Sequence, residues 1–173
     1  MIDIGIIGDK NGMLERALGR FFPYAAARHA DRVQKPQQYD ILIIGEAAGL
    51  DSLEGEGEIF ADITLLNSDS RGAGAGASRI NPGQIVTYGF NGKSCITASS
   101  VGENSVLICI QRILFTLSGE PIMPQELKAE HDEGWGDIRH HLGAYACGAV
   151  CGFARGLMLN DLAYYSQQMN SFK

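Results

Sequence analysis

The sequence lacks any run of lysine and arginine residues, and its formal net charge at pH 7 is −6. Proteins that bind nucleic acid need a basic face that neutralises the phosphates, so this composition argues against nucleic acid as the main partner. The N-terminal residues also lack a positively charged start, a following apolar segment and a small-residue cleavage site. Because these features mark a secretory signal, we expect a cytoplasmic protein.

Cysteine is scarce, and the four cysteines, Cys95, Cys109, Cys147 and Cys151, are irregularly spaced. In a cytoplasmic protein we expect reduced thiols rather than disulfide bonds. Cys147 and Cys151 lie one helical turn apart and could share a soft metal, but two thiols supply only half of such a site. Free cysteine is commonly a core residue, and this is our interpretation of both.

Long hydrophobic runs are scarce as well. The longest candidate, residues 142–159, contains Arg155 and many small residues, with a glycine at every fourth position from Gly148 to Gly156. An arginine at the centre of a bilayer costs about 3 kcal/mol on insertion scales, so we expect no membrane segment. Apolar residues at a 3.6-residue period instead predict a buried helix over residues 139–158. Its glycine face makes a homo-oligomer an alternative arrangement.

Apolar runs alternate with helical patterns along the rest of the chain. Runs at residues 2–7, 39–45 and 61–66 predict strands, and their continuity is typical of parallel strands covered on both faces. Apolar residues at helical spacing predict a helix that starts at Met13. Further strand and turn patterns predict an antiparallel extension over residues 85–127, which ends in a hairpin.

These patterns together predict an α/β fold, a three-layer sandwich of P-loop or Rossmann-like type with a mixed sheet. The length of 173 residues fits a single domain over residues 1–173. The sequence RGAGAGAS at residues 71–78 predicts a flexible, Gly-rich loop at about residues 71–80, because no helical pattern follows it.

The first candidate for a phosphate-binding loop follows the N-terminal strand and contains Gly8, Lys10, Asn11 and Gly12. A glycine loop that opens onto a helix presents backbone N–H groups to an anion. This loop lacks the Lys-Ser or Lys-Thr pair that holds phosphate and Mg²⁺ in a P-loop. Nucleotide binding here is therefore a hypothesis, and a structural strand-to-helix turn is the alternative.

The second candidate loop contains Gly89, Asn91, Gly92, Lys93 and Ser94. Its end matches the template G-x-x-x-x-G-K-[ST], although a threonine stands where the template has its first glycine. A phosphate loop also needs a helix directly after the lysine, whereas the following residues are mostly β-branched or hydroxylic and predict a strand. We interpret the loop as a polar turn between antiparallel strands, with nucleotide binding as the alternative.

Glu46 follows the apolar run of residues 39–45. In open α/β sheets, ligands bind beyond the carboxyl ends of the strands. Glu46 is therefore a candidate to bind a metal or to orient a nucleophile, and a solvent-facing loop acid is the alternative.

The order of these elements resembles the central, ATP-binding domain of the Mur ligases, in a shortened form. These are the ATP-dependent amide-forming enzymes of peptidoglycan synthesis. Residues 4–12 (IGIIGDKNG) are similar to the strand and T-G-T-N-G-K-T loop of that family, without its Lys-Thr end. Residues 40–50 (DILIIGEAAGL) resemble the strand that ends in a magnesium-binding glutamate, which implies this role for Glu46.

Further segments carry the same resemblance. Residues 65–69 (LLNSD) resemble a later strand that ends in Asn and Asp, and residues 85–90 resemble the strand that opens the antiparallel portion. His140 starts a segment similar to the H-N-x-x-N motif near the adenine, but His141 and Ala144 replace its two asparagines. The resemblance implies ATP and Mg²⁺ as cofactors of an intact member, and these departures imply a degenerate one.

We therefore expect a Mur-ligase-like domain that has lost catalysis and binds a nucleotide or a protein partner. The alternative is an ATP-dependent ligase-type or nucleotide-hydrolysing enzyme. In that reading, either Lys10 or the pair Lys93 and Ser94 would hold the phosphates, and Glu46 would hold Mg²⁺.

Overall fold

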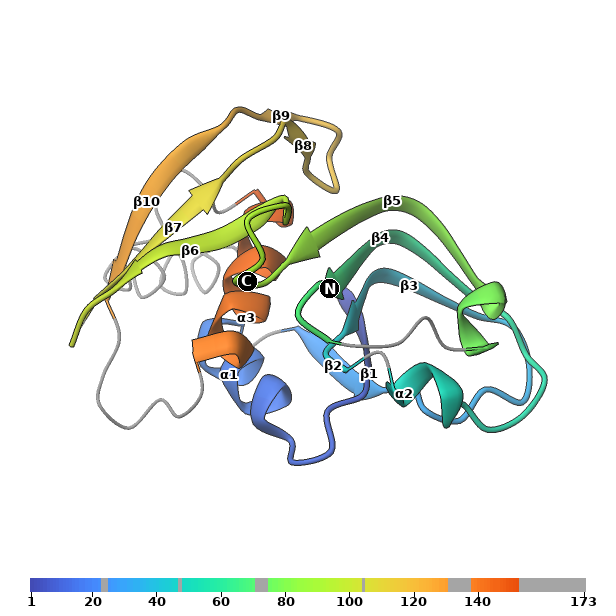
Figure 1. Ribbon diagram of the computed structural model, residues 1–173. Helices are drawn as coiled ribbons and strands as arrows, with labels where there is room; N and C mark the ends of the chain where they lie inside the picture. The colour runs from blue at the N-terminus through green and yellow to red at the C-terminus, as the bar shows by residue number, and fades with distance from the viewer. Residues whose placement is uncertain (23–24, 47, 71–74, 104, 131–137, 153–173) are drawn as a thin grey trace, which may run out of the picture.

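The computed structural model describes residues 1–173 except residues 23–24, 47, 71–74, 104, 131–137 and 153–173 (Figure 1). Within the described residues, eight strands form one sheet in the order β10-β7-β6-β5-β4-β3-β1-β2, and two short strands form a separate hairpin. The strands are β1 (Asp3–Ile7), β2 (Ala26–His29), β3 (Gln37–Ile44), β4 (Ile59–Asn67), β5 (Ile80–Tyr88), β6 (Ile96–Val101), β7 (Ser105–Ile110), β8 (Leu114–Phe115), β9 (Pro121–Ile122) and β10 (Gln125–Glu130). The helices are α1 (Met13–Phe21), α2 (Ala48–Asp51), α3 (Ile138–Val150) and the 3-10 helix η1 (Ala75–Arg79).

The sheet has a parallel part, β1 to β5, and an antiparallel part formed by β6, β7 and β10. This arrangement confirms the predicted mixed α/β fold. The strands predicted from apolar runs correspond to β1, β3 and β4, and the predicted hairpin corresponds to β8 and β9.

The sequence prediction that the antiparallel part starts at residue 85 is wrong. β5 pairs with β4 in parallel orientation along its length, and it meets β6 through one parallel pair, Tyr88 with Ile96. Residues 89–94 are therefore not a hairpin turn. They form a loop after which the chain continues in the same direction, fixed at its start by the Gly89 N–H, which donates to the Ile96 carbonyl at 3.1 Å.

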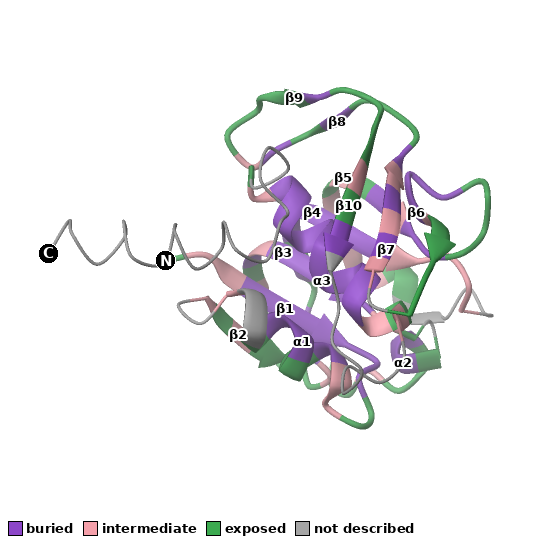
Figure 2. Cartoon of the chain, turned by 90° about the vertical axis from the view of Figure 1, so that its left-hand side faces the viewer, coloured by how far each residue is buried: buried purple, intermediate pink, exposed green. Residues whose placement is uncertain are grey.

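Helices α1 and α3 pack on one face of the sheet (Figures 1 and 2). In α1, Leu14, Ala17 and Leu18 recur at helical spacing and are buried, whereas Glu15 and Arg16 are exposed. In α3, all residues from 141 to 150 are buried, as expected for a helix that is apolar on most sides. On the opposite face, Leu50 of α2 packs in a second cluster with residues of β1, β3 and β4.

Helix α3 is shorter than the sequence pattern predicts. It ends at Val150, and Gly152 follows in a turn with a φ of 92°, a left-handed conformation that ends helices. The rest of the predicted helix, residues 153–158, lies outside the described residues. Of the three glycines of the predicted face, Gly148 is buried, Gly152 is exposed and Gly156 lies outside the described residues, so the homo-oligomer alternative stays a prediction. Among the helices of the described residues, none is long and apolar enough to cross a membrane.

Two other sequence features have simple counterparts in the structure. Of the predicted Gly-rich loop, residues 71–74 lie outside the described residues, but Ala75–Arg79 form η1 and Ile80 starts β5. Cys147 is fully buried, and a hydrogen bond with Cys151, together with burial, raises the pKa of its thiol well above the ordinary value. A thiol that stays protonated fits the interpretation of Cys147 as a core residue.

Arg79 fixes the start of β5 to the loop before β4, a role that the sequence did not reveal. Its guanidinium donates to the carbonyl oxygens of Gly57 (2.8 and 3.0 Å), Leu53 (3.2 Å) and Val33 (3.4 Å). Hydrogen bonds from a charged donor contribute more than neutral ones. The side chain is half-buried. If it were removed, water could therefore reach only some of the carbonyl oxygens that it now contacts.

We expect Arg79→Met to lower the free energy of unfolding by about 2 kcal/mol, because it removes the charged donor of the Gly57 and Leu53 carbonyl groups. The Val33 carbonyl loses only its second donor, since it also accepts from the Gly57 N–H at 2.8 Å. Urea denaturation measures the change. The matched control is Arg32→Met, since Arg32 makes one exposed ion pair with Glu54 at 3.7 Å. Such a pair is worth at most about 1 kcal/mol. Equal losses in both variants would contradict this role of Arg79.

Candidate functional site

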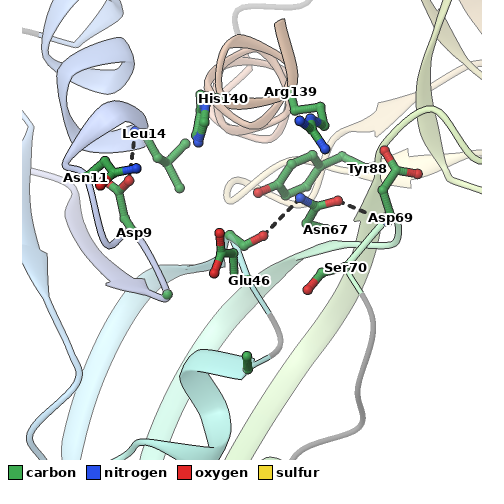
Figure 3. A pocket seen from close by; sticks show the side chains of 13 residues that line it. Asp9, Asn11, Leu14, Glu46, Asn67, Asp69, Ser70, Tyr88, Arg139 and His140 are labelled. Carbon is green, nitrogen blue, oxygen red and sulfur yellow. Dashed lines mark hydrogen bonds between the residues drawn. The ribbon is translucent and has the colours of Figure 1, made fainter. Parts of the chain in front are cut away.

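A pocket of about 430 Å³ lies at the carboxyl ends of β1, β3, β4 and β5, below the first turn of α3 (Figure 3). This edge is where ligands bind in open α/β sheets. The lining residues are Gly8, Asp9, Asn11 and Leu14 from the β1–α1 connection and α1, Gly45, Glu46 and Ala48 from the β3–α2 connection and α2, Asn67, Asp69 and Ser70 from β4 and its following loop, Tyr88 from β5, and Arg139 and His140 from α3.

In the first candidate phosphate loop, a side-chain carboxylate already binds the backbone N–H groups. Asp9 is 7% exposed, and its carboxylate accepts hydrogen bonds from the backbone N–H groups of Leu14 (3.1 Å) and Glu15 (2.9 Å). These N–H groups belong to the first turn of α1, where a helix has no carbonyl partners of its own. Gly12 is the N-cap residue and has no side chain to cap them. The carboxylate of Asp9 therefore occupies the position that a phosphate would take at this helix.

In the second candidate loop, a carboxylate also binds backbone N–H groups that a phosphate would need. The carboxylate of Asp69 accepts hydrogen bonds from the backbone N–H groups of Phe90 (2.7 Å) and Asn91 (2.9 Å). The loop then leads into β6, which confirms the prediction that no helix follows Lys93. The Ser94 hydroxyl is buried and lies 2.6 Å from the Ser68 hydroxyl, whereas Lys93 is exposed.

The structure brings together part of the predicted site. Gly8, Asn11, Glu46 and His140 line one pocket, and Lys10 reaches it through an ion pair of 3.7 Å between its Nζ and Glu46 Oε2. Gly12 stands outside the lining, at the start of α1. The residues of the second loop, Gly89, Asn91, Gly92, Lys93 and Ser94, are also outside the lining and connect to the pocket through Asp69.

Asn67 and Asp69 were noted in the sequence only as part of a resemblance, with no role in a site, and the structure places both in the pocket lining. The Nδ2 of Asn67 donates to the Gly45 carbonyl (2.9 Å), and its Oδ1 accepts from the Asp69 N–H (3.0 Å). Asn67 thus ties the carboxyl ends of β3 and β4 together and orients Asp69 toward the second loop (Figure 3). Polar residues at the carboxyl end of a buried strand were the signal that could have identified this pair.

Tyr88 forms an inner wall of the pocket, packed against α3. A Cβ atom at Gly143 would lie 3.1 Å from the Tyr88 hydroxyl, so a glycine at this position permits the close approach. Burial raises the pKa of Tyr88 well above its ordinary value of 10.0, and the nearby charges of Asp9 and Asp69 raise it further. Burial also raises the pKa of Tyr145 well above its ordinary value. Both phenols therefore stay protonated in the folded protein.

Raised tyrosine pKa values make the folded protein sensitive to alkali. Below pH 10 the phenol is protonated in both the folded and the unfolded protein. Above pH 10 the unfolded protein loses this proton while the folded protein keeps it, so the free energy of unfolding falls as the pH rises. Each such tyrosine lowers the free energy of unfolding by up to about 1.4 kcal/mol per pH unit in this range. We expect Tyr88→Phe to make this decline shallower, as measured by urea denaturation between about pH 9 and pH 11. Parallel pH profiles of the variant and the wild type would contradict the burial of this phenol.

Within the described residues, no three His, Cys, Asp or Glu side chains are grouped so that they could hold a metal ion. Most of the acidic and histidine-containing stretch after Glu130 lies outside these residues. The role of Glu46 as a Mg²⁺ ligand remains a prediction.

The fold and the pocket define a mixed α/β domain with a polar site at the carboxyl edge of its parallel strands. No protein-family model and no curated protein matches this sequence. Among solved structures, the chain is similar to the crystal structure of MurF from Acinetobacter baumannii, with 10% sequence identity and a TM-score of 0.44. The match covers 93% of this chain and 44% of that one, so this chain spans less than half of MurF. A similarity at this level supports no inference about function.

Proposed function

We propose that the protein is a non-catalytic, Mur-ligase-like binding module in which the chain's own carboxylates close both candidate phosphate sites. The observation that supports this function is the pairing of Asp9 with the first turn of α1 and of Asp69 with the second loop. A phosphate could use either set of N–H groups only by displacing a carboxylate. The displaced carboxylate would then lie beside the incoming negative charge.

Charge at the pocket supports the same conclusion. Among the described residues, its lining contains three carboxylates, those of Asp9, Glu46 and Asp69, and one arginine, Arg139. A nucleoside triphosphate carries several negative charges and needs cations and N–H donors around it. Lys10 is one of the two lysines predicted to hold phosphate, and its ammonium group pairs with Glu46. The pocket therefore favours a ligand that is neutral or positively charged.

A second candidate function is an ATP-using enzyme. One observation favours it, since Gly8, Asn11, Glu46 and His140 share a pocket and Lys10 pairs with Glu46. In this alternative, Asp9 would turn away from α1 when the phosphates bind, and Glu46 would exchange Lys10 for Mg²⁺. Lys93 and Ser94 would act only if Asp69 released its loop, because this carboxylate occupies two of the loop N–H groups.

Isothermal titration calorimetry with Mg-ATP and Mg-ADP separates the two functions. We expect no saturable binding to the wild type up to about millimolar nucleotide, which corresponds to less than about 4 kcal/mol of binding free energy. The variants Lys10→Ala, Glu46→Ala and Lys93→Ala should give the same flat titration. Circular dichroism and urea unfolding confirm that each variant is folded.

Saturable nucleotide binding that one lysine variant abolishes would reject the non-catalytic proposal. The position of that lysine would then identify the phosphate site. Loss in Lys10→Ala would assign the β1–α1 loop, whereas loss in Lys93→Ala would assign the loop after β5.

A further inference from the structure

The polar groups around the pocket differ in how far hydrogen bonds within the chain already occupy them. The carboxylates of Asp9 and Asp69 accept backbone N–H groups, and both ends of the Asn67 amide are hydrogen-bonded. Ser70 and Arg139 also have interactions within the chain. Glu46 differs from these residues, because its side chain is 54% exposed and forms an ion pair with Lys10 over a distance of 3.7 Å. Glu46 is therefore the carboxylate that a ligand can reach most easily.

The ion pair between Glu46 and Lys10 indicates which chemistry this carboxylate accepts. The partner is a primary ammonium group on a flexible side chain that is 70% exposed. Exposed ion pairs of this kind are worth at most about a fivefold change in an equilibrium constant. An ammonium group from a ligand can therefore replace Lys10 at little cost.

The surroundings of Glu46 also select a positive charge. Asp9 and Asp69 line the same pocket, and hydrogen bonds from neutral N–H groups do not cancel their charges. In a partly enclosed site, attraction and repulsion between charges are stronger than in bulk water. Among the described lining residues, these three carboxylates outnumber one arginine, Arg139, so a cationic ligand group is favoured and an anionic group is opposed.

His140 supplies a polar contact on the opposite wall. Its imidazole extends from α3 toward the pocket (Figure 3). The Nδ1 atom is buried and not open to the pocket, so a ligand can contact only the outer edge of the ring. An imidazole can donate or accept a hydrogen bond, and a hydroxyl or carbonyl group therefore suits this side. A volume of about 430 Å³ is in the range of small-molecule sites.

We propose that the pocket binds a small molecule with a protonated primary amine at one end and a neutral hydrogen-bonding group at the other. The ammonium group pairs with Glu46 in place of Lys10, and the polar end contacts His140. This inference rests on the proposed non-catalytic function, because it requires a pocket that is not occupied by a nucleotide.

A matched series of four-carbon ligands tests the charge preference by calorimetry on the full chain. The probes are 4-amino-1-butanol, 1,4-butanediol and 4-hydroxybutyrate, which share one hydroxyl end and differ only in the charge at the other. We expect the amino alcohol to bind about tenfold more tightly than the diol, and the carboxylate to show no saturable binding.

Variants of the two ion pairs test the position of the amine. Glu46→Gln should weaken 4-amino-1-butanol about tenfold, and Lys10→Met should strengthen it about threefold by removing the internal competitor. The matched control is Glu54→Gln, because Glu54 forms an exposed pair with Arg32 at the same distance of 3.7 Å. Both glutamate variants change the net charge equally, so the control corrects for long-range attraction.

His140→Phe tests the polar end. It should weaken 4-amino-1-butanol but leave butylamine, which lacks the hydroxyl, unchanged. A folding defect would weaken both ligands, and urea unfolding identifies it separately.

Failure of this inference can be distinguished from failure of the proposed function. Equal binding of the amino alcohol and the diol, or equal effects of Glu46→Gln and Glu54→Gln, would overturn the amine assignment. The non-catalytic function would then still stand if Mg-ATP does not bind. Saturable Mg-ATP binding would overturn the proposed function and this inference together.

Discussion

Replacement of Gly8 by alanine is expected to lower the free energy of unfolding by at least about 3 kcal/mol. Gly8 has a φ of 73°, and a Cβ atom there would lie 2.4 Å from the backbone oxygen of Glu46 and 2.8 Å from its nitrogen. Neither atom belongs to a side chain that could rotate away. The ends of β1 and β3 would have to separate, and with them the floor of the pocket.

Urea denaturation of Gly8→Ala measures this loss, and Gly19→Ala provides the control. Gly19 lies on the exposed side of α1, and a Cβ atom there has no neighbour within 4 Å. Alanine in an exposed helix position stabilises by up to about 1 kcal/mol relative to glycine. The two variants should therefore change stability in opposite directions. A Gly8→Ala protein as stable as the wild type would contradict the close contact between the two loops.

Replacement of Asp9 by alanine is expected to have the second largest effect, a loss of about 2 to 3 kcal/mol of unfolding free energy. The carboxylate caps two N–H groups of α1, those of Leu14 and Glu15, and is buried. Its removal leaves both donors without a partner at the end of a helix. Thermal unfolding measures the loss, with Asp62→Ala on the exposed side of β4 as a control that should change little.

The same variant should gain affinity for anions, which a purely structural defect would not produce. Once Asp9 is absent, the N–H groups of the first turn of α1 are open to a phosphate. Inorganic phosphate should therefore raise the unfolding temperature of Asp9→Ala, but not that of the wild type or of Asp62→Ala. A phosphate effect of equal size in all three proteins would show that Asp9 does not block an anion site.

Much of the fold follows from local patterns in the sequence. Continuous apolar runs are sufficient to locate β1, β3 and β4, because parallel strands are buried on both faces. The spacing of Leu14, Ala17 and Leu18 identifies α1. The relation of β5 to β6 was not predictable in this way, because it depends on one residue pair and on a loop held by Asp69, a residue 21 positions before Phe90.

The candidate site shows the same division. The sequence pointed to glycine-containing loops and to the acid after β3, since their residue types are visible directly, and the structure places Gly8, Asn11 and Glu46 in one pocket lining. It could not show whether the N–H groups of these loops already had partners. Asp9 is close to its partners in the sequence, yet its side chain could have pointed to solvent. Burial and the distances to Leu14 and Glu15 decide this question, and they emerge only from the packed chain.

The single pair of Tyr88 with Ile96 makes the sheet weakest at its middle rather than at its edges. Helix α3 spans this joint, since it packs on β3, β4 and β5 on one side and on β6 on the other (Figure 1). The strands on each side pair with one another over many residues. Helix α3 therefore joins the parallel and the antiparallel part of the sheet. We expect local unfolding to begin at this junction, because each part keeps its own backbone hydrogen bonds when α3 moves. The floor of the pocket would then stay intact, since it belongs to the parallel part.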